Sequence, residues 1–130
     1  MKFNHVAHRL DSAHFDLVVD LLTSQLGFVV LRRLAHAVWL RQPGTNVDLQ
    51  FSSSSTTHRD DDKQRSQVSF LSLTPSEDLQ KLVAWLAERG LSASVGAYSD
   101  REFFIDAPAA FVDFVIEAMR PELAEYDMQV

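Results

Sequence analysis

Apolar residues follow two different periods along this chain, and the changes between the periods divide it into elements. Apolar and polar residues alternate over 3–10, which predicts a β-strand. Over 12–26 the apolar residues recur at helical spacing, at Phe15, Val18, Val19, Leu22 and Leu26. Asp11 or Ser12 is a suitable N-cap for this helix, and Gly27 is placed to end it.

Three more strands are predicted before the middle of the chain, at 28–34, 37–42 and 47–51. The Pro-Gly-Thr-Asn sequence at 43–46 predicts a turn between the last two. The segment 52–66 contains serines, threonines and consecutive aspartates but no large apolar residue. It therefore reads as a solvated linker.

The second half repeats the order of elements in the first half. The predicted elements are a strand at 67–73, a helix at 76–89 and strands at 91–97, 102–105 and 111–116. Gly27 and Gly90, which follow the two helices, are 63 residues apart (90 − 27), and Asp48 and Asp113 are 65 apart (113 − 48). The common offset indicates an internal duplication. The sequence predicts an α+β fold of two βαβββ modules.

The segment 111–119 is open to two interpretations. Its apolar residues Phe111, Phe114, Val115, Ala118 and Met119 also fit one face of a helix. Period alone does not separate a short buried strand from a helix. The repeat favours a strand to about Ile116, followed by a helix or coil.

Composition limits the class of protein. With 130 residues the chain is expected to be a single domain, divided into a first module at 1–51, the linker at 52–66, a second module at 67–120 and a tail at 121–130. The absence of cysteine excludes disulfides and thiolate chemistry. No apolar run is long enough to span a membrane, and a net charge of −6 argues against nucleic-acid binding. A cytoplasmic location is expected.

Four motifs, in order along nearly the whole chain, resemble one known family. They are His5-Val6-Ala7-His8-Arg9-Leu10 with the later Gln25-Leu26-Gly27-Phe28, then Val47-Asp48-Leu49, then Gln67-Val68-Ser69-Phe70, and finally Ile105-Asp106-Ala107-Pro108 with Val112-Asp113-Phe114. Together they resemble the vicinal oxygen chelate superfamily of glyoxalases, bleomycin resistance proteins and extradiol dioxygenases. The resemblance implies that the modules curl into a half-open mixed β-sheet barrel with the helices outside.

The resemblance also implies a metal site in the concavity of the barrel. The family's ligand positions fall on His5, Asp48, Gln67 and Asp113. One imidazole and three oxygen ligands would suit Mn, Fe, Ni, Zn or Mg. Only His5 matches the commonest family pattern, because both aspartates replace glutamates and Gln67 replaces a histidine.

Two functions follow from the resemblance. The first is a metal-dependent lyase, isomerase or ring-cleaving dioxygenase acting on a small molecule. The second is a metal-free protein that binds or sequesters a small molecule such as a drug, in which Asp48 and Asp113 would suit a cationic ligand. The resemblance also implies a homodimer, with the modules paired within or across chains.

Arg9, Trp39 and Phe103 are candidate ligand contacts in such a cavity. Arg9 shares a strand face with His5 and could bind a carboxylate or phosphate of the ligand, or pair with a cavity aspartate. Trp39 and either Phe103 or its neighbour Phe104 could supply aromatic walls, although ordinary core packing explains them nearly as well. His58, beside the aspartates at 60–62, fits a charged flexible loop better than a metal site.

Overall fold

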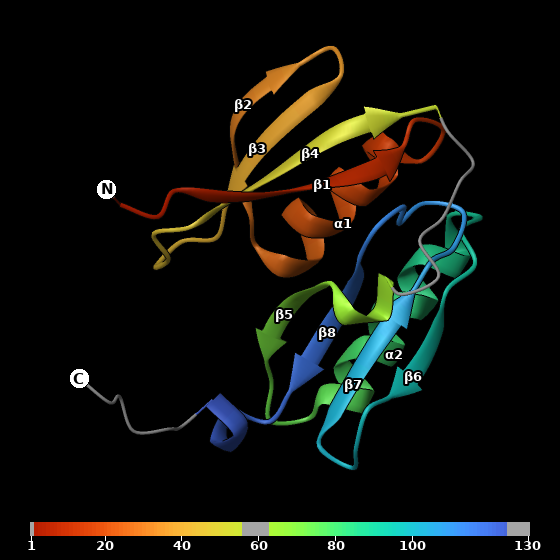
Figure 1. The fold of residues 1–130 in the computed structure, drawn as a ribbon. Helices are drawn as coiled ribbons and strands as arrows, with labels where there is room; N and C mark the ends of the chain where they lie inside the picture. The colour runs from red at the N-terminus through yellow and green to blue at the C-terminus, as the bar shows by residue number, and fades with distance from the viewer. Residues whose placement is uncertain (1, 56–62, 125–130) are drawn as a thin grey trace.

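The computed structural model describes residues 2–55 and 63–124 and contains two copies of a βαβββ unit (Figure 1). The first unit comprises β1 (His5–Asp11), α1 (Phe15–Leu26), β2 (Val29–Leu34), β3 (Ala37–Arg41) and β4 (Asp48–Ser54). The second comprises β5 (Gln67–Leu71), α2 (Pro75–Glu88), β6 (Ser94–Ala97), β7 (Glu102–Asp106) and β8 (Val115–Met119). Short 3-10 helices lie at Lys63–Arg65 and Pro121–Ala124. The predicted α+β fold of two modules is confirmed.

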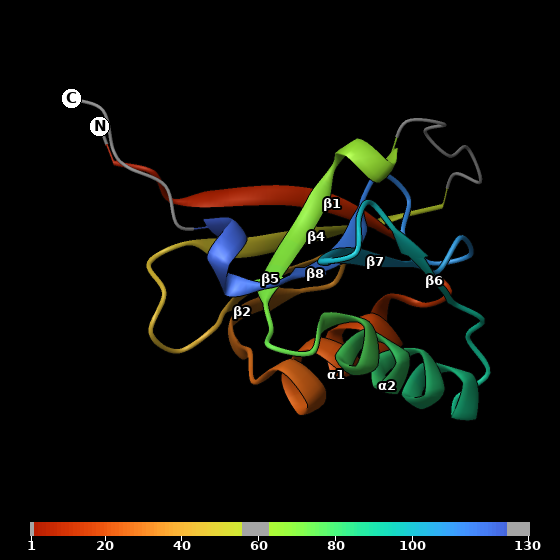
Figure 2. The same ribbon diagram turned by 90° about the horizontal axis from the view of Figure 1, so that it is seen from below.

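Each module forms one mixed four-stranded sheet with the same topology. The strand orders are β1-β4-β3-β2 and β5-β8-β7-β6, and the first pair in each sheet, β1 with β4 and β5 with β8, is parallel. Figure 2 shows both helices on the same side of the strands. The other side of each sheet is called its open face below.

The core lies between the helices and the sheets. Alternate strand residues and the apolar stripes of both helices are buried there, among them Val18, Leu22, Val38, Leu40, Phe51, Leu79, Leu86, Ile105 and Ile116. Alternation along the strands places Trp39, Asp48, Phe104 and Glu117 on the open faces.

The two modules pack directly against each other within the chain. Leu10 of β1 forms an isolated antiparallel bridge with Phe111, and the Asp11 amide donates to the Ala110 carbonyl at 2.9 Å. The Phe114 ring packs 4.7 Å from the Phe111 ring and also contacts His8 and Phe51 of the first module. Through this aromatic cluster, the turn before β8 packs against β1 and β4 of the first sheet.

Several boundaries differ from the sequence prediction. The first helix begins at Phe15 after His14, because the Asp11 carboxylate accepts from the nearby Ala13 amide instead of capping the helix. Gly27 ends this helix in the left-handed conformation, with φ of 71°. Strand β4 continues to Ser54, so the connection to the second module begins later than predicted.

The segment 111–119 contains a strand rather than a helix, but β8 begins later than the predicted residue 111 and continues to Met119, past the predicted end at Ile116. Phe111, Val112 and Phe114 are fully buried in an irregular turn, and β8 starts only at Val115. Filling the space between the modules takes precedence over strand pairing in this turn. His58, the aspartates at 60–62 and the residues after Ala124 lie outside the described residues, and no helix in the described part is long and apolar enough to cross a membrane.

Candidate binding cavity

The first two predicted metal ligands, His5 and Asp48, are brought together on neighbouring strands. Their Cα atoms are direct partners in the parallel β1–β4 pair. The Asp48 side chain is engaged by Arg41, whose Nε donates to Oδ1 at 2.6 Å and whose second nitrogen donates to Oδ2 at 3.3 Å. The hydrogen bond with Asp48, reinforced by the carboxylate charge, raises the pKa of Arg41 above its usual value. Asp48 is therefore held by a bidentate arginine.

The other two predicted ligands are placed differently. The β5–β8 register pairs Gln67 with Val115, so Asp113 lies two positions before the residue that matches Asp48. The Asp113 carboxylate instead accepts from the Arg9 backbone amide at 3.0 Å and from Arg9 Nε at 3.2 Å. His8 Nδ1 is 3.5 Å from the same carboxylate. Asp113 and Arg9 thus join the modules to each other.

These residues do not fit a divalent metal centre. Among residues 2–55 and 63–124 no three histidine, aspartate or glutamate side chains are grouped so that they could hold an ion. Both predicted aspartates form ion pairs with arginines, which offset the negative charge that would attract a divalent ion. His5 lies beside an aspartate that is paired with an arginine, and its Nδ1 is 2.9 Å from Asn4 Oδ1.

The two predicted aromatic ligand contacts, Trp39 and Phe103, do not lie in one cavity. Trp39 lies on the open face of the first sheet under the guanidinium of Arg32, whose central carbon is 5.6 Å from the ring. Phe103 instead packs against the core. Its neighbour Phe104 lies on the open face, where its ring centroid is 4.8 Å from that of Tyr98 and the two rings are tilted by 38°. Strand alternation permits only one of the two phenylalanines on the open face, and the structure selects Phe104.

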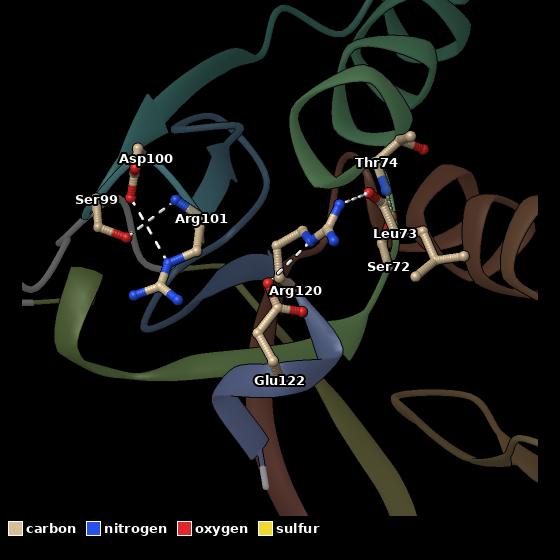
Figure 3. Close-up of polar contacts among 8 residues, drawn as sticks. All are labelled: Ser72, Leu73, Thr74, Ser99, Asp100, Arg101, Arg120 and Glu122. Carbon is tan, nitrogen blue, oxygen red and sulfur yellow. Dashed lines mark hydrogen bonds and ion pairs between the residues drawn. The ribbon is translucent and has the colours of Figure 1, made fainter.

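Phe103 borders a small cavity of about 320 Å³ at the start of α2. Arg120 closes one side of it, donating to the Leu73 carbonyl at 2.6 Å and to Glu122 at 3.1 Å (Figure 3). In the same view Arg101 and Asp100 lie on the neighbouring turn and bind each other. Arg120 and Asp100, which line this smaller cavity, are thus both engaged by neighbouring residues of the chain.

The larger cavity lies between the modules and has a volume of about 490 Å³. Its walls come from β1, the residue Phe28 before β2, the turn before β4, β4 itself and the edge strand β5. The lining residues are Val6, Phe28, Gln42, Thr45, Val47, Leu49, Gln67, Val68, Ser69, Phe70 and Leu71. Most of them are apolar, and several are otherwise exposed, including Leu71 at 58%. Ligand pockets in proteins commonly enclose about 300–1,000 Å³ with such walls. The cavity has the size and lining of a small-molecule site.

Polar side chains mark two sides of this cavity. On the first module, Gln42 Nε2 donates to the Leu26 carbonyl at 2.9 Å, and Thr45 Oγ1 donates to the Gln42 carbonyl at 2.8 Å. On the second, Gln67 Nε2 donates to the Gln64 carbonyl at 2.9 Å. These hydrogen bonds hold the polar side chains at the edge of the apolar cavity.

Ser69 connects the cavity to a buried carboxylate that the sequence interpretation missed. Its hydroxyl donates to Glu117 Oε1 at 2.6 Å, and Glu117 is only 8% exposed. Burial, followed by the charges of Glu117 and Glu102, raises the pKa of Tyr98, while the Gln67 hydrogen bond acts in the opposite direction. The sequence signal for Glu117 is an acidic residue among the apolar residues of the last strand, the same pattern as at Asp48.

Solved structures with this arrangement are numerous, although no protein-family model and no curated protein matches the sequence. A possible glyoxalase from Bacillus cereus aligns over 92% of this chain and 98% of its own, with a TM-score of 0.60 and 17% identity. The chain has the fold of the glyoxalase, bleomycin-resistance and dioxygenase proteins. This is the vicinal oxygen chelate fold that the four sequence motifs predicted.

Two neighbours with the glyoxalase fold are binding proteins by name. The bleomycin-binding protein from bleomycin-producing Streptomyces verticillus, complexed with copper(II)-bleomycin, aligns over 92% of this chain and 98% of its own at a TM-score of 0.53 and 14% identity. An antibiotic binding protein from a Streptomyces species aligns over 93% of this chain and 96% of its own at a TM-score of 0.50 and 16% identity. At these identities the likeness establishes a shared fold.

Proposed function

We propose that this chain is a metal-independent protein that binds a small, largely apolar molecule in the cavity between its modules. The observation that carries the proposal is the cavity of about 490 Å³, walled mainly by apolar side chains from both modules. Burying apolar ligand surface there is favourable by roughly 25 cal/mol per Å² removed from water. The walls come from β1, β4 and β5, which the core of each module holds in place.

The environment of the predicted metal ligands supports binding over metal chemistry. Asp48 forms an ion pair with Arg41, and Asp113 forms an ion pair with Arg9. Names of proteins with the same fold agree with a binding role, since one binds bleomycin and another an antibiotic. A small apolar ligand, rather than an oxygenated substrate chelated to a metal, suits the apolar walls.

Filling the cavity tests the proposal. Phenylbutanol, a neutral apolar probe, is expected to bind the wild-type protein, as measured by titration calorimetry and by chemical-shift changes in ¹H–¹⁵N spectra. Leu71→Trp, at a lining position that is 58% exposed, is expected to abolish binding by occupying the space without overpacking the core. The matched control is Leu73→Trp, because Leu73 is 70% exposed in the same segment but does not line this cavity.

The proposal would be overturned if phenylbutanol bound equally to the wild type and Leu71→Trp, or if the wild type bound neither phenylbutanol nor the amine and carboxylate analogues of the same shape. Metal analysis addresses the alternative. We expect no stoichiometric ion in protein incubated with Mn, Fe, Ni or Zn and then desalted. A stoichiometric ion that is lost in His5→Ala would replace the proposal with the metal-dependent lyase, isomerase or dioxygenase that the sequence motifs suggested.

A further inference from the structure

The polar side chains of the cavity have mostly used their hydrogen-bond donors on the protein itself. Thr45 Oγ1 and Ser69 Oγ each have a single proton, and both protons are donated, to the Gln42 carbonyl and to Glu117 Oε1. A hydroxyl that has donated its proton retains its lone pairs. Towards a ligand, both hydroxyls therefore act as acceptors.

The two amide side chains follow the same rule. Gln67 Nε2 has two protons, and it donates to the Gln64 carbonyl at 2.9 Å and to the Tyr98 hydroxyl at 3.3 Å. Because the Tyr98 hydroxyl donates its own proton to the Gln64 carbonyl, it receives the proton from Gln67. Gln42 commits one N–H to the Leu26 carbonyl. Carbonyl oxygens only accept, so both amides must turn nitrogen towards the protein, and Oε1 of each remains as an acceptor.

Glu117 adds negative charge behind this group of acceptors. Its carboxylate is 8% exposed, and no lysine, arginine or histidine forms an ion pair with it within the part of the chain that the structure describes. Its 2.6 Å bond from Ser69 has the length of a charge-assisted O–H···O⁻ hydrogen bond. The bond polarises Ser69 Oγ and strengthens it as an acceptor on the cavity side. A buried carboxylate without a cationic partner is costly unless something compensates its charge.

The backbone does not add a preference for either donors or acceptors to the one set by the side chains. Strand β5 pairs only with β8 and forms an edge of its sheet. The outward edge of a strand offers N–H and C=O groups in equal numbers. Discrimination between ligands therefore rests on the side chains, which offer acceptors, one remaining amide N–H of Gln42 and a nearby negative charge.

We propose that the cavity selects an apolar amine in its protonated form, whose ammonium group donates hydrogen bonds to Ser69 Oγ and the neighbouring amide oxygens while Glu117 balances its charge. The apolar part of the ligand lies against Phe28, Val47 and Leu49. Glu117 acts through Ser69 and is a positioning residue. An anionic ligand of the same shape would meet acceptors and a carboxylate. This inference rests on the proposed binding function and specifies its ligand class.

Three probes of one shape test the selection: phenylbutylamine, phenylbutanol and phenylbutanoate, titrated by calorimetry at neutral pH and low salt. The amine is expected to bind about tenfold more tightly than the alcohol, the worth of one charge-assisted hydrogen bond. The carboxylate is expected to bind most weakly. Added salt is expected to lower the affinity for the amine and to leave the affinity for the alcohol unchanged, because of these two only the amine carries a charge.

Two variants assign the preference to residues. Ser69→Ala and Glu117→Gln are each expected to bring the amine affinity down to that of the alcohol while the alcohol affinity stays at its wild-type value. Glu88→Gln, at the exposed C-terminal end of α2, is the control that removes one carboxylate of equal charge far from Ser69. Thermal melts verify folding, and Ser69→Ala carries the test if Glu117→Gln does not fold.

The outcomes separate this inference from the proposed function. Equal binding of amine and alcohol, tighter binding of phenylbutanoate, or an amine preference that persists in Ser69→Ala would overturn the amine selection and leave the cavity as a neutral binding site. Failure of all three probes to bind would overturn the proposed function, and the amine selection with it.

Discussion

At the scale of single residues, three charged side chains are buried in the described chain, and each has a different environment: Asp48, Lys63 and Glu117. Asp48 is neutralised by Arg41, and Glu117 accepts a hydrogen bond from Ser69. Lys63 lies on the 3-10 helix before β5, where its Nζ is 2.6 Å from Asp106 Oδ1 and donates to the Phe111 carbonyl at 2.8 Å. The contact with Asp106 is an ion pair rather than an aligned hydrogen bond. Lys63 thus holds the turn at the junction of the modules.

Replacing Lys63 is expected to destabilise the whole fold. Lys63→Met keeps the aliphatic stem but leaves the Asp106 carboxylate and the Phe111 carbonyl without their cation. Removing one member of a buried pair costs about 3–5 kcal/mol. Urea denaturation should show this loss in the free energy of unfolding, whereas Lys81→Met, on the exposed face of α2, should change it little. A loss no larger than that of the control would show that the ion pair does not hold the junction.

At the scale of elements, close contact between strands explains residues that local propensity does not. Gly96 on β6 is the direct partner of Phe104 on β7. A Cβ atom at Gly96 would lie 2.4 Å from the end of the Phe104 ring. The glycine therefore makes room for the aromatic ring, which lies against the tilted ring of Tyr98 on the open face.

We expect Gly96→Ala to destabilise the second sheet because the methyl group displaces the ring of Phe104. Overpacking of this kind costs about 1–3 kcal/mol. The double variant Gly96→Ala with Phe104→Leu should recover part of the loss, so that a double-mutant cycle on unfolding free energies gives a coupling between the two positions. Strict additivity of the two changes would contradict the contact.

At the scale of the whole molecule, one edge of the first sheet remains uncovered within the described residues. All six residues of β2 are exposed, including Val29, Val30, Leu31 and Leu34. A long apolar edge strand is a template for pairing with another chain. This edge is the surface that best suits the homodimer implied by the sequence resemblance.

The dimer is a prediction that light scattering measures directly. At micromolar concentration the wild type should have twice the mass of the 14.7 kDa chain. Val29→Lys should shift the mass towards that of one chain, because a lysine on an edge strand opposes strand pairing. Leu73→Lys, an equally drastic change at an exposed leucine away from β2, should leave the mass unchanged. A wild-type mass near 14.7 kDa would end the dimer prediction.

The sequence by itself determined the elements of this protein. Two apolar periods, the turn at 43–46 and the glycines after both helices predicted the order of the first seven strands and the two helices, because these signals lie in neighbouring residues. The eighth strand followed only from the repeat, because its apolar residues also fit one face of a helix. The repeated spacing then gave two modules, and the ordered motifs gave the fold family.

Only the tertiary structure decided the site. The family resemblance placed the last ligand position at Asp113, but Phe111 and Phe114 are buried in the preceding turn and β8 begins only at Val115. The partners that decide the chemistry are distant in the chain: Ser69 binds Glu117 across 48 residues, and Arg9 binds Asp113 across 104. Strand register determines such pairs, and a slip of one residue turns every side chain to the other face. Which polar groups are free to bind a ligand therefore becomes visible only after the two modules have packed together.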